Sequence, residues 1–269
     1  MKIIRKKKEL KKLIDNEISL GFVPTMGAIH KGHISLVKKS NSQCNKTIVS
    51  IFVNKPQFNR KIDFKSYPRL LAKDIKILKN HKVDFLYLPN ENEIYPDRPN
   101  KKIKIHPFKK KLCGKFRSGH FEAVVDVIDR FIKIIMPKNV YLGEKDMQQL
   151  KLIDHYITRK YKNINVVPCK TIREKNGVAC SSRNYLLSFK EKSIASKIYQ
   201  LLKRTKNNLI KRKINLNLIK NKIKNIGVSK IDYIEILDIN KIIKPYLKKS
   251  KYKIFIAYYL RKTRLIDNI

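Results

Sequence analysis

Between residues 20 and 168 the sequence alternates short apolar runs with longer stretches that repeat apolar residues at helical spacing. The apolar runs are rich in β-branched residues, as in 47–53, which is typical of parallel strands covered on both faces. Residues 120–135 show the helical spacing most clearly, and Pro137 ends that stretch. Strand and helix alternate five times, and this pattern predicts an α/β fold with a doubly wound parallel sheet.

The same pattern gives a residue range for most of the elements. We expect strands after Ser19 and at 47–53, 85–89, 139–142 and 164–168. We expect helices at 5–16, 32–41, 67–78, 120–135 and 147–157. A short strand-like run at 103–105 interrupts an otherwise irregular stretch rich in proline, lysine and asparagine.

The last part of the chain has a different character. Residues 191–226 are helical and very basic, and two β-rich runs follow at 233–237 and 252–257. They predict a smaller α+β domain with an antiparallel pair of strands. We therefore divide the chain into a doubly wound, Rossmann-like domain of residues 1–171 and an α+β domain of residues 172–269.

Two histidines lie where the first predicted strand turns into a helix. Pro24 and Gly27 end the strand, and His30 and His33 come at the start of the helix. At such a point backbone N–H groups and the positive end of the helix dipole face solvent, so a nucleotide phosphate can be held there. Without further context, the histidines are equally well a metal pair at helical spacing or ordinary surface residues. The chain has neither a GxxxxGK[ST] nor a GxGxxG motif, so bound ATP would need this other device.

Polar side chains follow three of the predicted strands, at 25–33, 54–57 and 143–149. In a doubly wound sheet, ligands bind at the carboxyl ends of the strands, near the point where the strand order reverses. The sequence therefore predicts one site assembled from these three clusters.

The formal net charge of +42 taken alone would suggest a nucleic-acid partner. The lysines are scattered from end to end, however, together with abundant isoleucine and asparagine, so we favour drifted surface composition over a binding face. The four cysteines are widely spaced and indicate free thiols in a reducing compartment. No apolar run is long enough to span a bilayer, and the N-terminus lacks the apolar core of a secretion signal. We expect a cytoplasmic protein without a membrane or a specific nucleic-acid partner.

The run PTMGAIHKGH at 24–33 resembles the HxGH signature of the nucleotidylyltransferase superfamily, which many enzymes share. The chain as a whole resembles the pantoate–β-alanine ligase family. The further similar segments are 51–58, 67–69, 117–121, 143–150, 173–184 and 264–268. The combination of GEKDMQQL at 143–150 with SSRN at 181–184 is highly specific for that family.

The resemblance implies a reaction in which (R)-pantoate, β-alanine and ATP give pantothenate, AMP and pyrophosphate through a pantoyl-adenylate. It also implies Mg²⁺ carried on the ATP phosphates, a homodimer, a first domain that binds ATP and pantoate, and a second domain that closes over the site. Two other functions stay open at this point. One is another HxGH enzyme that transfers AMP to a phosphorylated acceptor, and the other is a basic nucleic-acid-binding module.

The resemblance also implies roles for particular residues. The ATP-binding residues are Met26, Gly27, Ala28, Ile29, His30, Lys31, Gly32, His33, Gly143, Glu144, Lys145, Asp146, Ile172, Cys180, Ser181, Ser182 and Arg183. Among them His33, His30, Lys145 and Arg183 are catalytic, with His33 as the presumed proton donor. Asp146 reaches the ribose hydroxyls, and residues 181–183 form a mobile clamp on the phosphates.

Gln57 and Gln149 match residues that bind pantoate, and Gln57 also lies near β-alanine. A helical patch of Val124, Val127 and Ile128 either packs on the geminal methyls of pantoate or belongs to the core. Asp74 is interpreted as a solvated helix carboxylate rather than as a support for the site.

Several positions depart from the family pattern. Cys113 replaces an acidic residue, Ser118 and Lys55 replace prolines, Glu122-Ala123 replaces a less charged pair, Asp126 replaces a threonine and Cys180 replaces a methionine. None of them removes a residue with a catalytic role, so we expect changes in the loop at 113–118 and in efficiency, with the same reaction.

Overall fold

The larger sheet in the computed structural model has six strands that all pair in parallel. The structure describes residues 1–15, 17, 19–100, 102–208, 215–239 and 252–269. The strands are β1 (Lys2–Ile4), β2 (Leu20–Thr25), β3 (Lys46–Ile51), β4 (Phe85–Tyr87), β5 (Asn139–Gly143) and β6 (Asn165–Cys169). All five predicted strands and their parallel pairing are confirmed. Strand β1 was not predicted, because three residues are too short to show a period.

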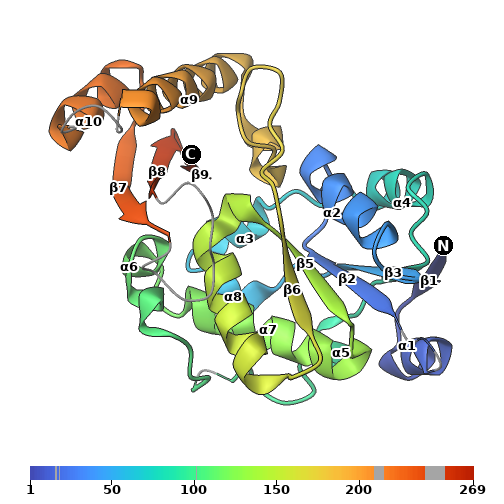
Figure 1. The fold of residues 1–269 in the computed structure, drawn as a ribbon. Helices are drawn as coiled ribbons and strands as arrows, with labels where there is room; N and C mark the ends of the chain where they lie inside the picture. Colours follow the sequence, from blue (N-terminus) through green and yellow to red (C-terminus); the bar gives the residue numbers. More distant parts are fainter. Residues whose placement is uncertain (16, 18, 101, 209–214, 240–251) are drawn as a thin grey trace.

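Helices cover both faces of this sheet (Figure 1). They are α1 (Lys7–Ile14), α2 (Lys31–Asn41), α4 (Leu71–Lys79), α7 (His120–Ile135) and α8 (Met147–Lys160). Adjacent strand residues point to opposite faces, so Phe22 belongs to the same core cluster as Ile132 of α7, while Val23 belongs to a second cluster with Val37 of α2 and Leu78 of α4. Burying each of these side chains stabilises the fold by about 1.5–3 kcal/mol. The sheet is therefore apolar on both sides, as the continuous apolar runs predicted.

Short turns and helices fill the connections. They are η1 (Lys55–Gln57), α3 (Lys61–Lys65), α5 (Glu91–Ile94), η2 (Pro107–Lys110), α6 (Cys113–Phe116), η3 (Glu144–Asp146) and η4 (Ser182–Leu186). The helix expected from residue 67 begins at Leu71. The strand-like run at 103–105 does not form a strand: Ile103 and Ile105 pack against the core, and neither pairs with a strand of the described residues. Their spacing reflects burial of two side chains.

The C-terminal part contains a second sheet, which is antiparallel. Its strands β7 (Lys230–Asp238), β8 (Tyr252–Leu260) and β9 (Thr263–Asn268) pair in that order. The expected pair is confirmed, and the third strand was missed because TRLIDN has two adjacent apolar residues and no alternation. The helical region expected at 191–226 corresponds to α9 (Phe189–Asn208) and α10 (Leu216–Asn225), and its residues 209–214 lie outside the described residues. Figure 1 shows these elements gathered at one end of the molecule.

The strand order β1-β4-β3-β2-β5-β6 places β2 between β3 and β5. The chain runs outward from β2 in one direction through β3 and β4, and in the other through β5 and β6. The order therefore reverses at β2, which is where a doubly wound sheet binds its ligands. Among the described residues, no helix is both long enough and apolar enough to cross a membrane.

Candidate active site

A cavity opens at the carboxyl edge of the larger sheet and extends to the C-terminal part of the chain. It brings together predicted residues that lie far apart in the sequence. They are Met26, His30, Gly32, His33, Gln57, Gly143, Lys145, Asp146, Gln149, Ile172, Cys180, Ser181, Ser182 and Arg183. The predicted ATP-binding residues Gly27, Ala28, Ile29, Lys31 and Glu144 are not among the residues that line it.

A buried carboxylate holds the turn between β2 and α2. Gly27 and Ala28 both have positive φ angles, +80° and +50°. The N–H groups of Ala28 and Ile29 donate to the two carboxylate oxygens of Asp74, at 2.8 and 2.7 Å. Asp74 is only 1% exposed, and burial raises the pKa of its carboxyl group. The expectation of a solvated carboxylate was therefore wrong: α4 turns this residue towards the turn and satisfies two of its backbone donors.

Three further backbone donors of this turn are also engaged. Gly27 N donates to Thr25 Oγ1 at 3.2 Å, His30 N to His33 Nδ1 at 3.4 Å, and Gly32 N to His30 Nδ1 at 3.1 Å. The expectation that free N–H groups at the start of α2 would hold a phosphate therefore fails for these residues. In these contacts the two imidazoles serve as the caps of α2.

His30 and His33 form a stacked pair with ring centroids 3.9 Å apart. Because Nδ1 of each ring accepts a backbone hydrogen bond, the proton of each neutral ring lies on Nε2. Burial and the charge of Lys145 lower the pKa of His30 to about 4. Burial, His30 and Lys145 lower the pKa of His33 well below its usual value. Both rings are therefore neutral hydrogen-bond donors. Among the described residues no group of three or more His, Cys, Asp or Glu could hold a metal ion.

These lowered pKa values predict that acid weakens the fold. The folded-state pKa values of His30, His33 and His120 lie below about 6.5, so between that pH and the folded pKa the unfolded chain binds protons that the folded chain does not. The free energy of unfolding should fall as the pH drops below 6.5, with a slope that reaches at most about 1.4 kcal/mol per pH unit for each histidine. Urea titrations at pH 7 and pH 5 measure this loss. A His30→Asn variant keeps an N-cap acceptor but cannot titrate, so an equal pH dependence in this variant and the wild type would contradict the assignment.

The loop that carries Lys145 is tied to the end of the chain. Asn268 of β9 donates from Nδ2 to the backbone oxygens of Glu144 and Lys145, at 2.8 and 2.7 Å. The Lys145 ammonium lies 3.3 Å from a carboxylate oxygen of Asp146, and its side chain is 18% exposed. Its charge lowers the pKa of both imidazoles of the turn at 27–33, called the HxGH turn below. The loop thus presents one cation beside two neutral donors.

The turn at 181–183 is fastened on two sides. The Ser182 hydroxyl lies 3.1 Å from the backbone oxygen of Ala28, so it ties this turn to the HxGH turn. Arg183 pairs with Asp63 of α3 at 3.0 Å, and Ser181 Oγ accepts from Arg183 N at 3.3 Å. Arg183 therefore has a carboxylate partner in the free protein, and its action as a clamp on phosphate stays a prediction.

Arg117 and His120 line the cavity, although sequence analysis gave them no role. His120 Nδ1 lies 2.9 Å from the backbone oxygen of Gln57, so Nδ1 carries the proton and Nε2 accepts from Arg117 at 2.9 Å. Burial and the charges of Arg183 and Arg264 lower the pKa of Arg117 to about 10. Arg117 has no ion-pair partner within the described part of the chain. The sequence did hold a signal, since RSGH at 117–120 sets a basic residue and a histidine before a helix, much as HKGH does.

The Gln57 side chain presents its amide nitrogen to the cavity. Its Oε1 accepts from Asn54 Nδ2 at 3.1 Å, and its Nε2 lies 3.0 Å from the sulfur of Met26. The apolar wall of the cavity includes Val124, Val127 and Ile128, which also belong to the main core. The two alternatives left open for this patch are therefore compatible.

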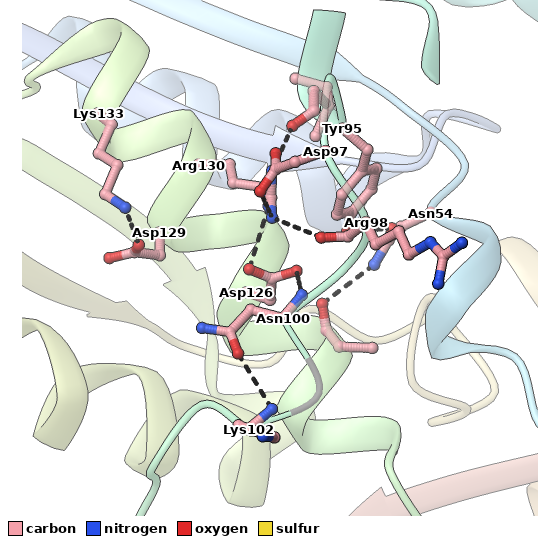
Figure 2. Close-up of polar contacts among 12 residues, drawn as sticks. Asn54, Tyr95, Asp97, Arg98, Asn100, Lys102, Asp126, Asp129, Arg130 and Lys133 are labelled. Atoms are coloured by element: carbon pink, nitrogen blue, oxygen red, sulfur yellow. Dashed lines mark hydrogen bonds and ion pairs between the residues drawn. The ribbon is translucent and has the colours of Figure 1, made fainter. Parts of the chain in front are cut away.

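Cys113 and Asp126, two of the positions that depart from the family pattern, are joined to other segments by polar contacts. Cys113 is buried, and its Sγ lies 3.1 Å from the hydroxyl of Tyr233 and 3.6 Å from the guanidinium of Arg264. Asp126 accepts from Arg130 Nε at 3.1 Å (Figure 2). The loop at 113–118, which we expected to differ from the family pattern, contains the short helix α6, and Cys113 contacts Tyr233 and Arg264 of the C-terminal sheet.

The comparisons with known proteins point to one family. The family model described as pantoate-beta-alanine ligase matches residues 2–269. The chain is 39% identical over 263 residues to a pantothenate synthetase of Clostridium botulinum (strain ATCC 19397 / Type A), covering 96% of this chain and 94% of the relative. It is 41% identical over 253 residues to a pantothenate synthetase of Francisella tularensis subsp. novicida, covering 93% and 88% of the two chains.

Solved structures agree with the sequence relatives. A pantoate-beta-alanine ligase from Francisella tularensis, crystallised with beta-gamma ATP and beta-alanine, superposes with a TM-score of 0.85 at 39% identity and covers 100% of this chain and 97% of the other. A pantothenate synthetase from Thermus thermophilus gives a TM-score of 0.89 at 29% identity, with 100% and 99% coverage.

Proposed function

Because this chain belongs to the pantoate–β-alanine ligase family, we propose that its cavity is the site of ATP-dependent pantothenate synthesis and that its residues divide the work as follows. The enzyme condenses (R)-pantoate with β-alanine through a pantoyl-adenylate and releases AMP and pyrophosphate. The observation that carries the assignment of roles is the meeting of two neutral imidazoles, Lys145 and Gln57 in one cavity. The imidazoles and the ammonium suit phosphates, and the amide suits the acid.

The triphosphate of ATP lies between the HxGH turn and the 181–183 turn in this proposal. His30 and His33 donate from Nε2, and Lys145 and Arg183 supply positive charge. Mg²⁺ bound to the ATP phosphates would lower their negative charge. Asp146 accepts hydrogen bonds from the ribose hydroxyls. Arg183 exchanges Asp63 for phosphate when ATP binds, and this exchange would close the clamp.

Pantoate occupies the end of the cavity beside α7. Gln57 and Gln149 hold its oxygens, and the apolar wall defined above faces its geminal methyls. In the first step a pantoate carboxylate oxygen bonds to the α-phosphorus while the bond to pyrophosphate breaks. Negative charge then shifts towards the leaving pyrophosphate, where the neutral imidazole donors and Lys145 stabilise it without reorganising.

The second step joins β-alanine to the adenylate. The amine of β-alanine attacks the acyl carbon, AMP departs, and the amine proton passes to solvent or to the leaving phosphate. AMP is a good leaving group, so orientation beside Gln57 is sufficient. Arg117, which has no carboxylate partner among the described residues, attracts the carboxylate of β-alanine to this end of the cavity.

Three further proposals follow from the family. We propose that residues 1–171 bind ATP and pantoate and that residues 172–269 close over them; a separate hydrophobic core within residues 178–265 supports this division. We also propose a homodimer, which sedimentation would test, and a cytoplasmic location.

Isotope exchange between pyrophosphate and ATP tests the proposed function. Exchange that depends on pantoate and needs no β-alanine is the expected result, because the first step is reversible on its own. Exchange without pantoate would instead indicate an HxGH enzyme with a different acceptor. Nucleic-acid binding that falls steeply with salt, together with no AMP release in the presence of all three substrates, would indicate the basic-module function.

The two adjacent glutamines of α8 allow a matched prediction. Both glutamines line the cavity, but the side chain of Gln148 is buried and bonded to Cys113 N, Phe108 O and Lys111 O at 2.7–3.0 Å, whereas Gln149 is half-buried. Gln149→Ala should raise KM for pantoate roughly tenfold while KM for ATP stays within about twofold, as expected for the loss of one hydrogen bond. Gln148→Ala should instead lower the melting temperature. Steady-state kinetics with each substrate varied in turn measures both KM values. Equal increases in KM for pantoate and for ATP in Gln149→Ala would indicate a structural role for Gln149.

A further inference from the structure

A chain of hydrogen bonds leads from Tyr95, which follows α5, to Gln57 at the cavity. The Tyr95 hydroxyl donates to Asn54 Oδ1 at 2.8 Å (Figure 2). Asn54 Nδ2 then donates to Gln57 Oε1 at 3.1 Å and to the backbone oxygen of Ala123 at 3.2 Å. Asn54 is 1% exposed, so these partners cannot be replaced by bulk water.

The orientation of the Asn54 amide follows from the chemistry of its partners. The backbone oxygen of Ala123 can only accept, so the amide atom that faces it must be Nδ2. Oδ1 then faces Tyr95 and needs a donor, which the phenol hydroxyl provides. Because Nδ2 also donates to Gln57, the atom of Gln57 that it meets must be Oε1. The amide nitrogen of Gln57 is thereby turned away from Asn54 and towards Met26, which lines the cavity.

Tyr95 is itself held in place by α7. The guanidinium of Arg130 lies 4.6 Å from the centre of the Tyr95 ring and donates to the backbone oxygen of Ile94 at 3.1 Å. The same guanidinium pairs with Asp97 at 2.8 Å and with Asp126 at 3.1 Å (Figure 2). These contacts fasten the segment that carries Tyr95 to the helix that forms the apolar wall.

Asp126, the residue found where the family pattern has threonine, completes this attachment. Its second oxygen accepts from Asn100 N at 3.0 Å, and the residue is 3% exposed. The segment 94–100 is therefore bound to α7 by a buried acid and an arginine one helical turn apart.

We propose that Tyr95 is a positioning residue that fixes the amide of Gln57, through Asn54, so that Gln57 offers an N–H donor to pantoate. The inference rests on the proposed role of Gln57 in pantoate binding. Its consequence is selectivity, since the site favours a substrate oxygen that accepts. If the Gln57 amide were flipped, Oε1 would take the place of Nε2 beside pantoate, and Gln57 could not donate a hydrogen bond to the carboxylate or hydroxyl oxygen.

Tyr95→Phe tests this inference because it keeps the ring beneath Arg130 and removes only the donor. KM for pantoate should rise roughly tenfold, and KM for ATP should stay within about twofold. Tyr87→Phe is the matched control: Tyr87 is fully buried in β4, and its hydroxyl has no hydrogen-bond partner among the described residues. Both KM values should be unchanged in the control. An unchanged KM for pantoate in Tyr95→Phe would overturn the proposal.

A double-mutant cycle separates positioning from a general loss of structure. If Tyr95 acts through Gln57, Tyr95→Phe has no further effect on KM for pantoate in a Gln57→Ala background. Additive effects would contradict the proposal. Asn54→Asp, made in parallel, keeps the acceptor for Tyr95 but loses the donor to Gln57, so its KM for pantoate should rise at least as much. An unchanged value there would count against the inference even if Tyr95→Phe fails to fold.

The wild-type exchange assay keeps the two proposals apart. Exchange that does not depend on pantoate would overturn the proposed function. Exchange that does depend on pantoate, together with an unaltered Tyr95→Phe enzyme, would overturn the role of Tyr95 alone.

Discussion

Lys145→Ala is expected to slow pantoyl-adenylate formation by roughly 10²- to 10³-fold, the scale for losing one preorganised charge-stabilising donor. The Lys145 ammonium lies beside the two imidazoles, and its loop is fixed by Asn268. The donor is therefore in place before ATP binds. Removing it leaves the two neutral imidazole N–H groups and Arg183, which first has to exchange Asp63 for phosphate, to meet the charge that develops on pyrophosphate.

Single-turnover adenylate formation with ATP and pantoate measures this effect without interference from the second step. Lys38→Ala is the matched control, since Lys38 is an exposed residue in the last turn of α2. It changes the net charge by the same amount and should leave the rate unchanged. A Lys145→Ala enzyme that forms the adenylate at nearly the wild-type rate would contradict the assigned role.

Sequence periodicity was sufficient to predict the parallel sheet that positions Lys145. Long apolar runs such as 47–53 predicted buried parallel strands, and polar residues after three of these strands predicted a common edge. The structure brings Gln57, Lys145 and Gln149 to one cavity because the carboxyl ends of parallel strands meet at the same edge. The sequence pattern could therefore predict which residues share the cavity, because the parallel topology places the ends of these strands at one edge of the sheet.

The remaining features depend on contacts between segments that the sequence does not pair. Asp74 has the pattern of an exposed helix residue, and only the packing of α4 against the turn at 27–29 shows that it is a buried acceptor. The short β1 is stabilised by pairing with β4, which no local propensity reveals. The orientation of the Gln57 amide depends on Tyr95, which lies 38 positions further along the chain.

His33→Ala is expected to slow adenylate formation by roughly 10²- to 10³-fold as well, because it removes a preorganised donor. The family resemblance implied a proton donor; in the free protein, burial, His30 and Lys145 lower the pKa of His33, and its Nδ1 accepts a backbone hydrogen bond, which supports a role as a neutral hydrogen-bond donor. A neutral imidazole donates a hydrogen bond and keeps its proton. His33→Gln, which retains an N–H group that cannot titrate, should therefore keep more activity than His33→Ala, and His81→Ala, outside the cavity, should match the wild type.

The pH dependence of the same step separates these two functions of His33. Because the pKa of His33 in the free enzyme lies well below 6.5, the ring is already neutral at pH 6, and raising the pH to 8 removes no proton from it. Any loss of rate between pH 6 and pH 8 should therefore be the same in the wild type and in His33→Gln. A general acid would behave oppositely: its rate would fall as the pH rose through its pKa, and the glutamine variant would lose both the fall and the activity. A wild-type fall between pH 6 and 8 that is absent from a nearly inactive His33→Gln would therefore show that ATP binding raises the pKa of His33 and makes it an acid.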